Sequence, residues 1–123
     1  MYDQPIDYKE KLFMRKIKSI TGLEPNSKEV RITFEDGSGI KQYHINDCCE
    51  VAEVSQVDAT PSKFIGAIAH DFVTKTSGGE TSEGHETWTF YTLKTSKGYL
   101  DWRWYGESNG YYSEEIESEF FEK

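Results

Sequence analysis

The alternation of apolar and polar residues with a period of two constrains this chain more than any other feature. Val30, Ile32 and Phe34 are separated by single charged or hydroxyl-bearing residues. Because successive side chains of a β-strand point to opposite faces, this spacing predicts a strand with one buried face. The motif D-G-S-G at 36–39 then predicts a hairpin turn into a second strand over Ile40–Ile45. The chain is therefore expected to build antiparallel sheet from hairpins.

The last third of the chain repeats this pattern. Strands are predicted over Glu86–Thr95 and Gly98–Tyr105, joined by a tight turn at Ser96-Lys97. The dipeptide Asn109-Gly110 is a strong hairpin signal, because both of its residues readily adopt positive φ. It predicts a third strand over Tyr111–Ile116, so the three strands would form a C-terminal meander.

The remaining segments carry weaker signals. Met14–Ile20 is predicted to be a strand, and Cys48–Val57 is either a strand or a short helix. Phe64–Thr76 is apolar early and β-branched late, which predicts a short helix passing into a strand. The polar, glycine-rich segment Ser77–Gly84 is expected to be a mobile loop, and Glu117–Lys123 an acidic tail.

Length and composition fit one domain over residues 1–123. A chain of this size buries roughly two-thirds of its unfolded surface, which is enough for one hydrophobic core. Aromatic residues make up 15% of the chain and must supply much of that core. The predicted fold class is mainly β (α+β), with a single antiparallel sheet and one or two short helices.

The net charge of −8 restricts the partners that the chain can bind. An acidic protein is repelled by a phosphate backbone, so we expect no direct nucleic-acid binding and favour a basic partner or plain solubility. No apolar run approaches the roughly 20 residues that cross a bilayer, and the polar start of the chain has no signal-peptide pattern. We therefore expect no membrane association.

The two cysteines, Cys48 and Cys49, are adjacent. Neighbouring Cα atoms lie about 3.8 Å apart, below the usual disulfide span of about 4.4–6.8 Å. A disulfide between them would be strained, so we expect reduced thiols. Reduced thiols are typical of the cytoplasm.

One face of the predicted strand Gly98–Tyr105 has the composition of a recognition surface. Alternation places Leu100, Trp102 and Trp104 together, which indicates the core face. Tyrosine and arginine dominate binding hot spots, so the opposite face could recognise a partner. The alternative is structural, since cross-strand aromatic pairs stabilise hairpins by about 0.2–1 kcal/mol each. The candidate binding residues are Tyr99, Arg103, Tyr105, Asn109 and Tyr112.

The segment H-I-N-D-C-C-E at 44–50 holds several potential metal ligands, but its spacing matches no common metal motif. No nucleophile with an adjacent base and no phosphate-binding glycine loop is recognisable. The sequence therefore predicts no catalytic residues, no metal and no cofactor. Secondary candidates for partner binding are His44, Asp47, Glu117 and Glu119.

Three motifs carry a resemblance to a known family. They are H-x-x-D-C-C-E, then T-W-T-F-Y, then R-W-Y-G-x-S-N-G-Y-Y-S-E. With the sequence around them, from about Met14 to Ile116, they resemble a family of small, uncharacterised proteins encoded by tailed bacteriophages and catalogued as a domain of unknown function. The resemblance implies a phage product in the bacterial host cytoplasm and brings no assigned activity or site residues. The segment 77–84 and the residues after Ile116 are expected to be particular to this member.

We therefore expect a phage accessory protein that acts by non-catalytic binding to a host protein, and a basic host protein would fit its charge. Inhibition of a bacterial defence or nucleic-acid-handling factor would fit the acidic charge. The alternative is a pocket protein that sequesters a small nucleotide signal, with Arg103 and the neighbouring aromatics holding phosphate and base. An uncharacterised enzyme ranks last.

Overall fold

The computed structural model describes residues 3–5, 14–45, 50–81, 84–108 and 115–122. Within these residues the chain is all β apart from one 3-10 turn, which confirms the mainly β prediction. The elements are β1 (Asp3–Pro5), β2 (Arg15–Thr21), β3 (Glu29–Phe34), β4 (Gly39–Tyr43), β5 (Val51–Val57), η1 (Pro61–Phe64), β6 (Ile68–Thr81), β7 (Gly84–Thr95), β8 (Gly98–Ser108) and β9 (Glu117–Phe121).

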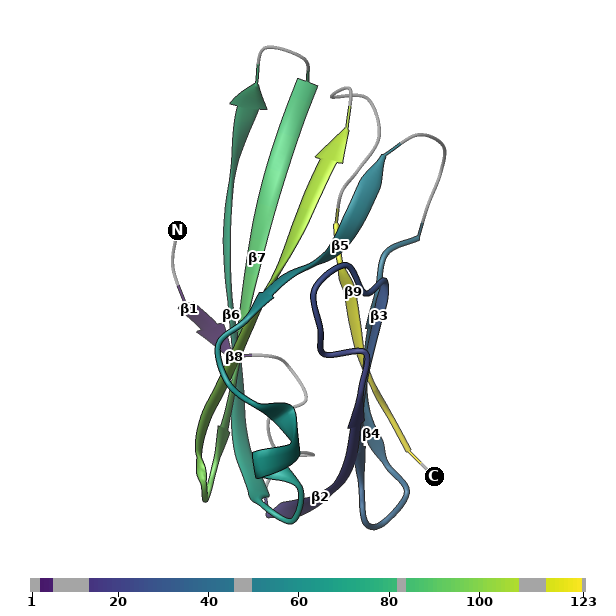
Figure 1. Cartoon of the computed structure of the whole chain (residues 1–123), viewed down its shortest axis with the longest axis vertical. Helices are drawn as coiled ribbons and strands as arrows, with labels where there is room; N and C mark the ends of the chain where they lie inside the picture. The colour runs from purple at the N-terminus through teal and green to yellow at the C-terminus, as the bar shows by residue number, and fades with distance from the viewer. Residues whose placement is uncertain (1–2, 6–13, 46–49, 82–83, 109–114, 123) are drawn as a thin grey trace.

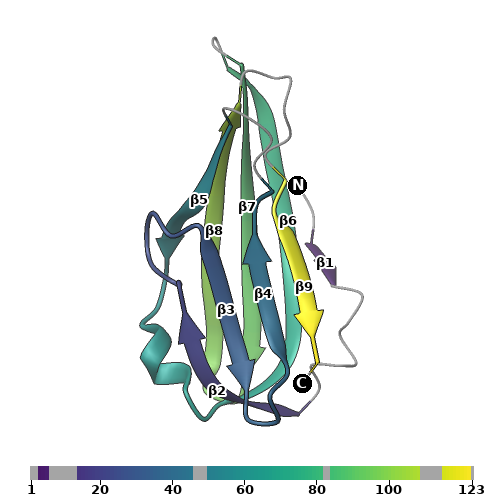
Figure 2. The same cartoon turned by 90° about the vertical axis from the view of Figure 1, so that its right-hand side faces the viewer.

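The strands form one antiparallel sheet that folds over into two facing layers (Figures 1 and 2). The strand order is β5-β8-β7-β6-β2-β3-β4-β9, and β1 also pairs with β6. Strand β2 belongs to both layers, since Arg15 and Lys16 pair with β6 and the residues from Ile17 onward pair with β3. A register shift between Ile17 and Ser19 lies at this change of partner. Such an irregularity bends a strand, which allows the sheet to turn a corner.

The two long sides of the molecule differ. On the β5 side, the loop after β2 bridges the layers, because Asn26 donates its backbone N–H to Val54 at 2.7 Å and Ser27 accepts one from Val54 at 2.8 Å. On the other side, no strand pairing joins β9 to β6 in the described residues. The two layers are therefore bridged along one side and open along the other.

The C-terminal meander differs from the sequence prediction in its last strand. Strands β6, β7 and β8 are consecutive and antiparallel. β8 pairs with β7 along one edge and with β5 along its other edge, where the third strand of the meander was expected. The strand predicted over Tyr111–Ile116 is wrong in its described part, because residues 115 and 116 are not in a strand; residues 111–114 lie outside the described residues. The next strand, β9, pairs with β4 in the other layer. The edge of β8 is taken by the apolar strand β5, which local hairpin signals cannot reveal.

Three further predictions are corrected. The loop predicted over Ser77–Gly84 is strand at its described residues 77–81 and 84, because β6 and β7 stay in register as far as Thr81 and Gly84. The helix predicted from Phe64 is only the end of η1, and Gly66 has a positive φ of 86° before β6 begins. The segment 117–121 of the predicted acidic tail is strand β9.

The core lies between the layers and is rich in aromatic side chains. Leu100, Trp102 and Trp104 are all buried, as their alternation predicted. Trp102 stacks with Phe72 and Tyr91, with ring centroids 5.8 Å away in each case. Offset aromatic pairs contribute beyond the area that they bury, by about 0.5–1.5 kcal/mol each.

A fully buried glutamine connects the two layers. Gln42 on β4 is 0% exposed, and its side-chain oxygen accepts the indole N–H of Trp102 at 2.9 Å and that of Trp104 at 3.0 Å. Its amide group donates to the hydroxyl of Ser118 on β9 at 3.3 Å. Both tryptophans therefore have a hydrogen-bond acceptor in the core, and the acceptor comes from the opposite layer.

We predict that Gln42→Leu lowers the free energy of unfolding by about 3 kcal/mol or more. Two buried indole donors would lose their acceptor, and each unsatisfied buried donor costs about 1–3 kcal/mol. Trp102→Phe is the comparison variant, because it removes one donor and leaves the Gln42–Trp104 bond in place. Urea denaturation measures both variants, and an unchanged midpoint for Gln42→Leu would contradict the structural role of this residue.

Candidate binding surfaces

The predicted recognition residues on β8 share the outer face of its layer. Tyr99, Arg103 and Tyr105 alternate with the buried residues Leu100 and Trp102. Tyr99 is 59% exposed, and the ammonium of a neighbouring lysine lies 5.5 Å from its ring centre. The other two predicted residues, Asn109 and Tyr112, lie outside the described residues.

Trp88 on β7 joins two of these residues into one surface, which we call the Trp88 cluster and define as Trp88, Arg103 and Tyr105. The rings of Trp88 and Tyr105 have centroids 4.5 Å apart and are tilted by 51°. The guanidinium of Arg103 lies 5.1 Å from the ring centre of Trp88, a cation–π contact. Sequence reasoning missed Trp88, although its alternation within T-W-T-F-Y places it opposite the core residue Tyr91.

Arg103 is only partly satisfied by its neighbours. Its Nη2 donates to the side-chain oxygen of Gln56 on β5. Its Nε is buried and has no hydrogen-bond partner in the described part of the chain. An unsatisfied buried donor is unfavourable, so this side chain contributes less to stability than a fully paired arginine would.

Tyr105 holds two carboxylates at one end of the cluster. Its hydroxyl lies 3.2 Å from Glu86 and 3.1 Å from Glu107, so it can donate to either carboxylate. Burial, and then the hydrogen bonds with Glu107 and Glu86, raise the pKa of Tyr105 to about 12. The phenol is therefore protonated at neutral pH and keeps two acidic groups close together.

A shallow groove of about 290 Å³ borders Arg103 on the same outer face. Phe90 and the stem of Lys75 contribute to its wall, and Asp58 and Asp101 also line it. The groove thus combines an apolar patch with charges of both signs. This outer face is the part of the layer where sequence reasoning expected a half-polar recognition surface.

The described secondary candidates, His44, Glu117 and Glu119, lie in or next to the opposite layer. His44 and Glu50 form a buried pair, with His44 Nε2 3.0 Å from Glu50 Oε2 and side chains that are 5% and 0% exposed. His44 Nδ1 lies 2.7 Å from the carbonyl oxygen of Glu115 and must donate a proton to it. One proton then lies between His44 Nε2 and Glu50. This pair is an internal connection between β4, residue 115 and the start of β5 rather than an exposed binding group.

Glu119 lies on the outer face of the β3-β4-β9 layer. The hydroxyl of Tyr43 donates to it at 3.3 Å, and Glu117 lies close enough to help raise the pKa of that tyrosine, after burial and Glu119 itself. Asp47 lies outside the described residues. The structure therefore separates the two sets of candidates, because the Trp88 cluster and the β9 glutamates face away from each other on opposite layers.

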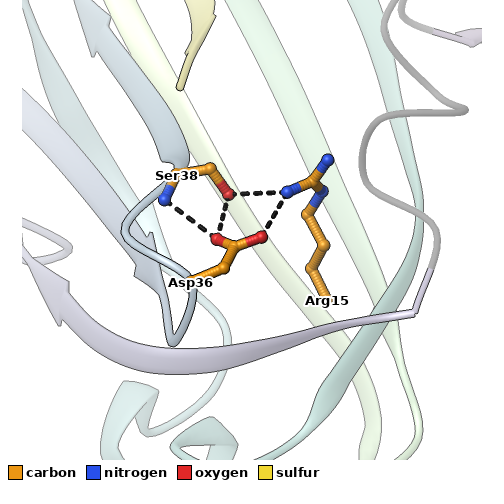
Figure 3. A network of polar contacts seen from close by, with 3 residues as sticks. All are labelled: Arg15, Asp36 and Ser38. Atoms are coloured by element: carbon orange, nitrogen blue, oxygen red, sulfur yellow. Dashed lines mark hydrogen bonds and ion pairs between the residues drawn. The ribbon is translucent and has the colours of Figure 1, made fainter. Parts of the chain in front are cut away.

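A third polar group, which sequence reasoning did not single out, closes the β3–β4 turn (Figure 3). Asp36 accepts from the backbone and hydroxyl of Ser38, and the guanidinium of Arg15 contacts both side chains. The Ser38 hydrogen bonds, followed by the charge of Arg15, hold the pKa of Asp36 below its usual value. Arg15 also stacks on Phe120 at 5.1 Å. These contacts tie β2 and β9 to the hairpin, so the group is structural.

Within the described residues there is no group of three or more histidine, cysteine, aspartate or glutamate side chains that could hold a metal ion. The described part of the chain also lacks a helix with the length and apolar character of a membrane span. Cys48 and Cys49 lie outside the described residues, so the prediction of reduced thiols stays a prediction.

Comparison with protein families gives one match. A family model described as a domain of unknown function, DUF7448, matches residues 10–118. The chain belongs to the DUF7448 family. The matched range contains every strand from β2 to β8, and with them the Trp88 cluster and the His44–Glu50 pair. No curated protein and no solved structure matches the chain. The resemblance to a family of unknown function is thus confirmed at that level, and the segment 77–84 lies within the family match.

We predict that His44→Ala lowers the free energy of unfolding by about 3–5 kcal/mol, because it leaves the buried Glu50 carboxyl without this partner. Glu50→Gln should cost less, since the glutamine amide can donate to His44 Nε2 while Nδ1 still donates to residue 115. Urea unfolding of both variants tests this order. A His44→Ala variant as stable as the parent would show that the pair does not support the fold.

The raised pKa of Tyr105 predicts a loss of stability at alkaline pH. Below its ordinary pKa of 10.0 the phenol is protonated in both states; between there and about 12 only the folded state keeps the proton. The unfolded chain then binds fewer protons, so stability falls as pH rises through this window. Tyr105→Phe should make that fall in melting temperature less steep. Tyr99→Phe, on the same strand, is the matched control, and an unchanged slope for Tyr105→Phe would contradict the assignment.

Proposed function

We propose that this protein is a non-catalytic binding domain that engages a partner protein through the outer face of β7 and β8. The observation that supports this most is the aromatic content of that face. Trp88, Phe90, Tyr99 and Tyr105 all lie on it, opposite the core. The outer face of an antiparallel layer is ordinarily polar, and aromatic clusters at a surface are typical of interaction sites.

The charges around the cluster favour a partner with a mixed but mainly basic surface. Tyr105 holds Glu86 and Glu107 together, and the whole chain has a net charge of −8. A basic partner would be attracted over distance, and its lysine or arginine side chains could pair with the two glutamates. A carboxylate or carbonyl group on the same partner could accept a hydrogen bond from the guanidinium of Arg103.

The biological setting is part of the same proposal. The motif resemblance to phage-encoded proteins supports a phage accessory protein that acts in the cytoplasm of a bacterial host. Its partner would then be a host protein, and a defence or nucleic-acid-handling factor would carry the basic surface that an acidic protein binds. Affinity capture from bacterial lysate, followed by mass spectrometry of proteins and small molecules, identifies the partner.

A second candidate function is sequestration of a small nucleotide. It is favoured by Lys75 and Arg103, two cationic residues that line the groove next to Phe90. Phosphate could pair with the cations and a base could stack on the ring. Asp58 and Asp101 line the same groove and would repel phosphate, which is why protein binding ranks first. A nucleotide released from the captured protein on denaturation would reverse this order.

We predict that Arg103→Ala weakens binding to the captured partner by tenfold or more while the melting temperature stays nearly unchanged. Among the described residues, Arg103 makes one side-chain hydrogen bond and one cation–π contact, and an exposed cation–π contact contributes only about 0.5–1 kcal/mol. Truncating a hot-spot arginine commonly costs about 2 kcal/mol or more of binding free energy. Calorimetric titration with the purified partner measures the affinity, and thermal melting measures the stability.

The matched control is Arg31→Ala. Arg31 also stacks on an aromatic ring, at 5.4 Å from the centre of Phe121, but it lies on the opposite layer. It should therefore leave binding unchanged. Equal losses in both variants would point to a nonspecific charge effect, and normal binding by Arg103→Ala would remove the Trp88 cluster from the interface.

A further inference from the structure

The open side of the molecule contains a second cavity, separate from the Trp88 cluster. This cleft has a volume of about 660 Å³ and lies between the inner face of β6 and β7 and residues 115–118. On β7 it runs from Tyr91 to His85, a distance of about 20 Å at the usual strand rise of roughly 3.4 Å per residue. The volume is within the range of about 300–1,000 Å³ that is usual for ligand sites. The cleft is therefore a long slot between the two layers.

The chemistry of the inner face changes where the cleft begins. Next to it the inner positions of β6 and β7 are Phe72 and Leu93, which are fully buried. Along the cleft the same alternation brings four threonines inward, namely Thr74, Thr76, Thr87 and Thr89. Ser118 adds another hydroxyl-bearing side chain to the lining from the β9 side. A core face thus becomes a wall of small hydroxyl-bearing side chains.

The lining favours an uncharged ligand. The residues that line the cleft in the described part of the chain include no lysine or arginine. They do include Glu115 and His85, whereas Glu117 borders the cleft from a position on β9 whose side chain faces outward, next to Tyr43. Phosphate and carboxylate ligands are therefore disfavoured. A threonine hydroxyl both donates and accepts, which matches the hydroxyl groups of a polyol. Tyr91 closes the cleft at its core end, where its buried ring stacks on Phe72 and Trp102.

We propose that this cleft binds a short, linear, uncharged oligosaccharide. The sugar hydroxyls exchange hydrogen bonds with the threonine wall. The His44–Glu50 pair stabilises one wall of the site, because His44 donates a hydrogen bond to the backbone carbonyl of Glu115, which lines the cleft. This site and the Trp88 cluster are on opposite sides of the β6-β7-β8 layer, so both can be occupied at once.

The test is NMR titration of the full, isotope-labelled chain with maltotriose, cellotriose, xylotriose and chitotriose in turn. Spermidine and AMP are titrated in parallel as cationic and anionic probes. We expect at least one trisaccharide to shift the amide signals of Thr76, Thr89 and Ser118, with little effect on those of Arg103. Shifts at the cleft with spermidine alone, with AMP alone, or with none of these probes would overturn the proposal.

The double variant Thr76→Val, Thr89→Val separates ligand binding from folding. Valine has nearly the shape of threonine and suits a strand, so the melting temperature should be maintained or rise. Loss of two hydrogen-bonding groups should weaken saccharide binding by roughly tenfold. Thr33→Val, on the outer face of β3, is the matched control and should bind normally. Unchanged binding by the double variant would also overturn the proposal, whatever the fate of the protein partner.

Discussion

The hydrogen bonds from Trp102 and Trp104 to Gln42 are the interaction on which the rest of the structure depends. The two indoles are the largest buried side chains, and each brings one N–H group into the core. A single carboxamide oxygen from the other layer accepts both of them. A buried donor without an acceptor is costly. This arrangement therefore fixes β4 and β8 as facing strands and sets how they are aligned along their length. It also keeps β4 over β8 although the two strands are far apart in the sheet order.

This anchor divides the interior into two regions. On one side of it the layers pack through the fully buried side chains of Phe72, Leu93 and Leu100. On the other side the layers part, and threonines replace the aliphatic residues along β6 and β7. The hydrogen bond from His44 to the carbonyl of residue 115 holds the β9 side of that opening in place. The same fold therefore provides a solid core and a polar cleft from one continuous pair of strands.

The outer face of β7 and β8 is organised by side-chain pairs rather than by burial. Trp88 contacts both Tyr105 and Arg103, so its ring is held by an aromatic neighbour and a cation. Tyr105 in turn fixes two glutamates through its hydroxyl. Side chains that are already ordered lose little entropy when a partner binds, which makes such a surface effective for recognition. This face and the cleft both lie within the DUF7448 match, on opposite sides of the β6-β7-β8 layer.

The sequence by itself determined the class of fold, the strand faces and the tryptophan core. The period-two alternation at 30–34 and 98–105 gave these results, because the side-chain direction in a strand depends only on local geometry. It also placed Arg103 and Tyr105 together on the face opposite the core. Only the tertiary structure decided that β8 pairs with β5, that β9 crosses to β4 and that Gln42 meets two indoles. These are contacts between residues distant in sequence, and strand pairing or a buried hydrogen bond of that kind has no local signal.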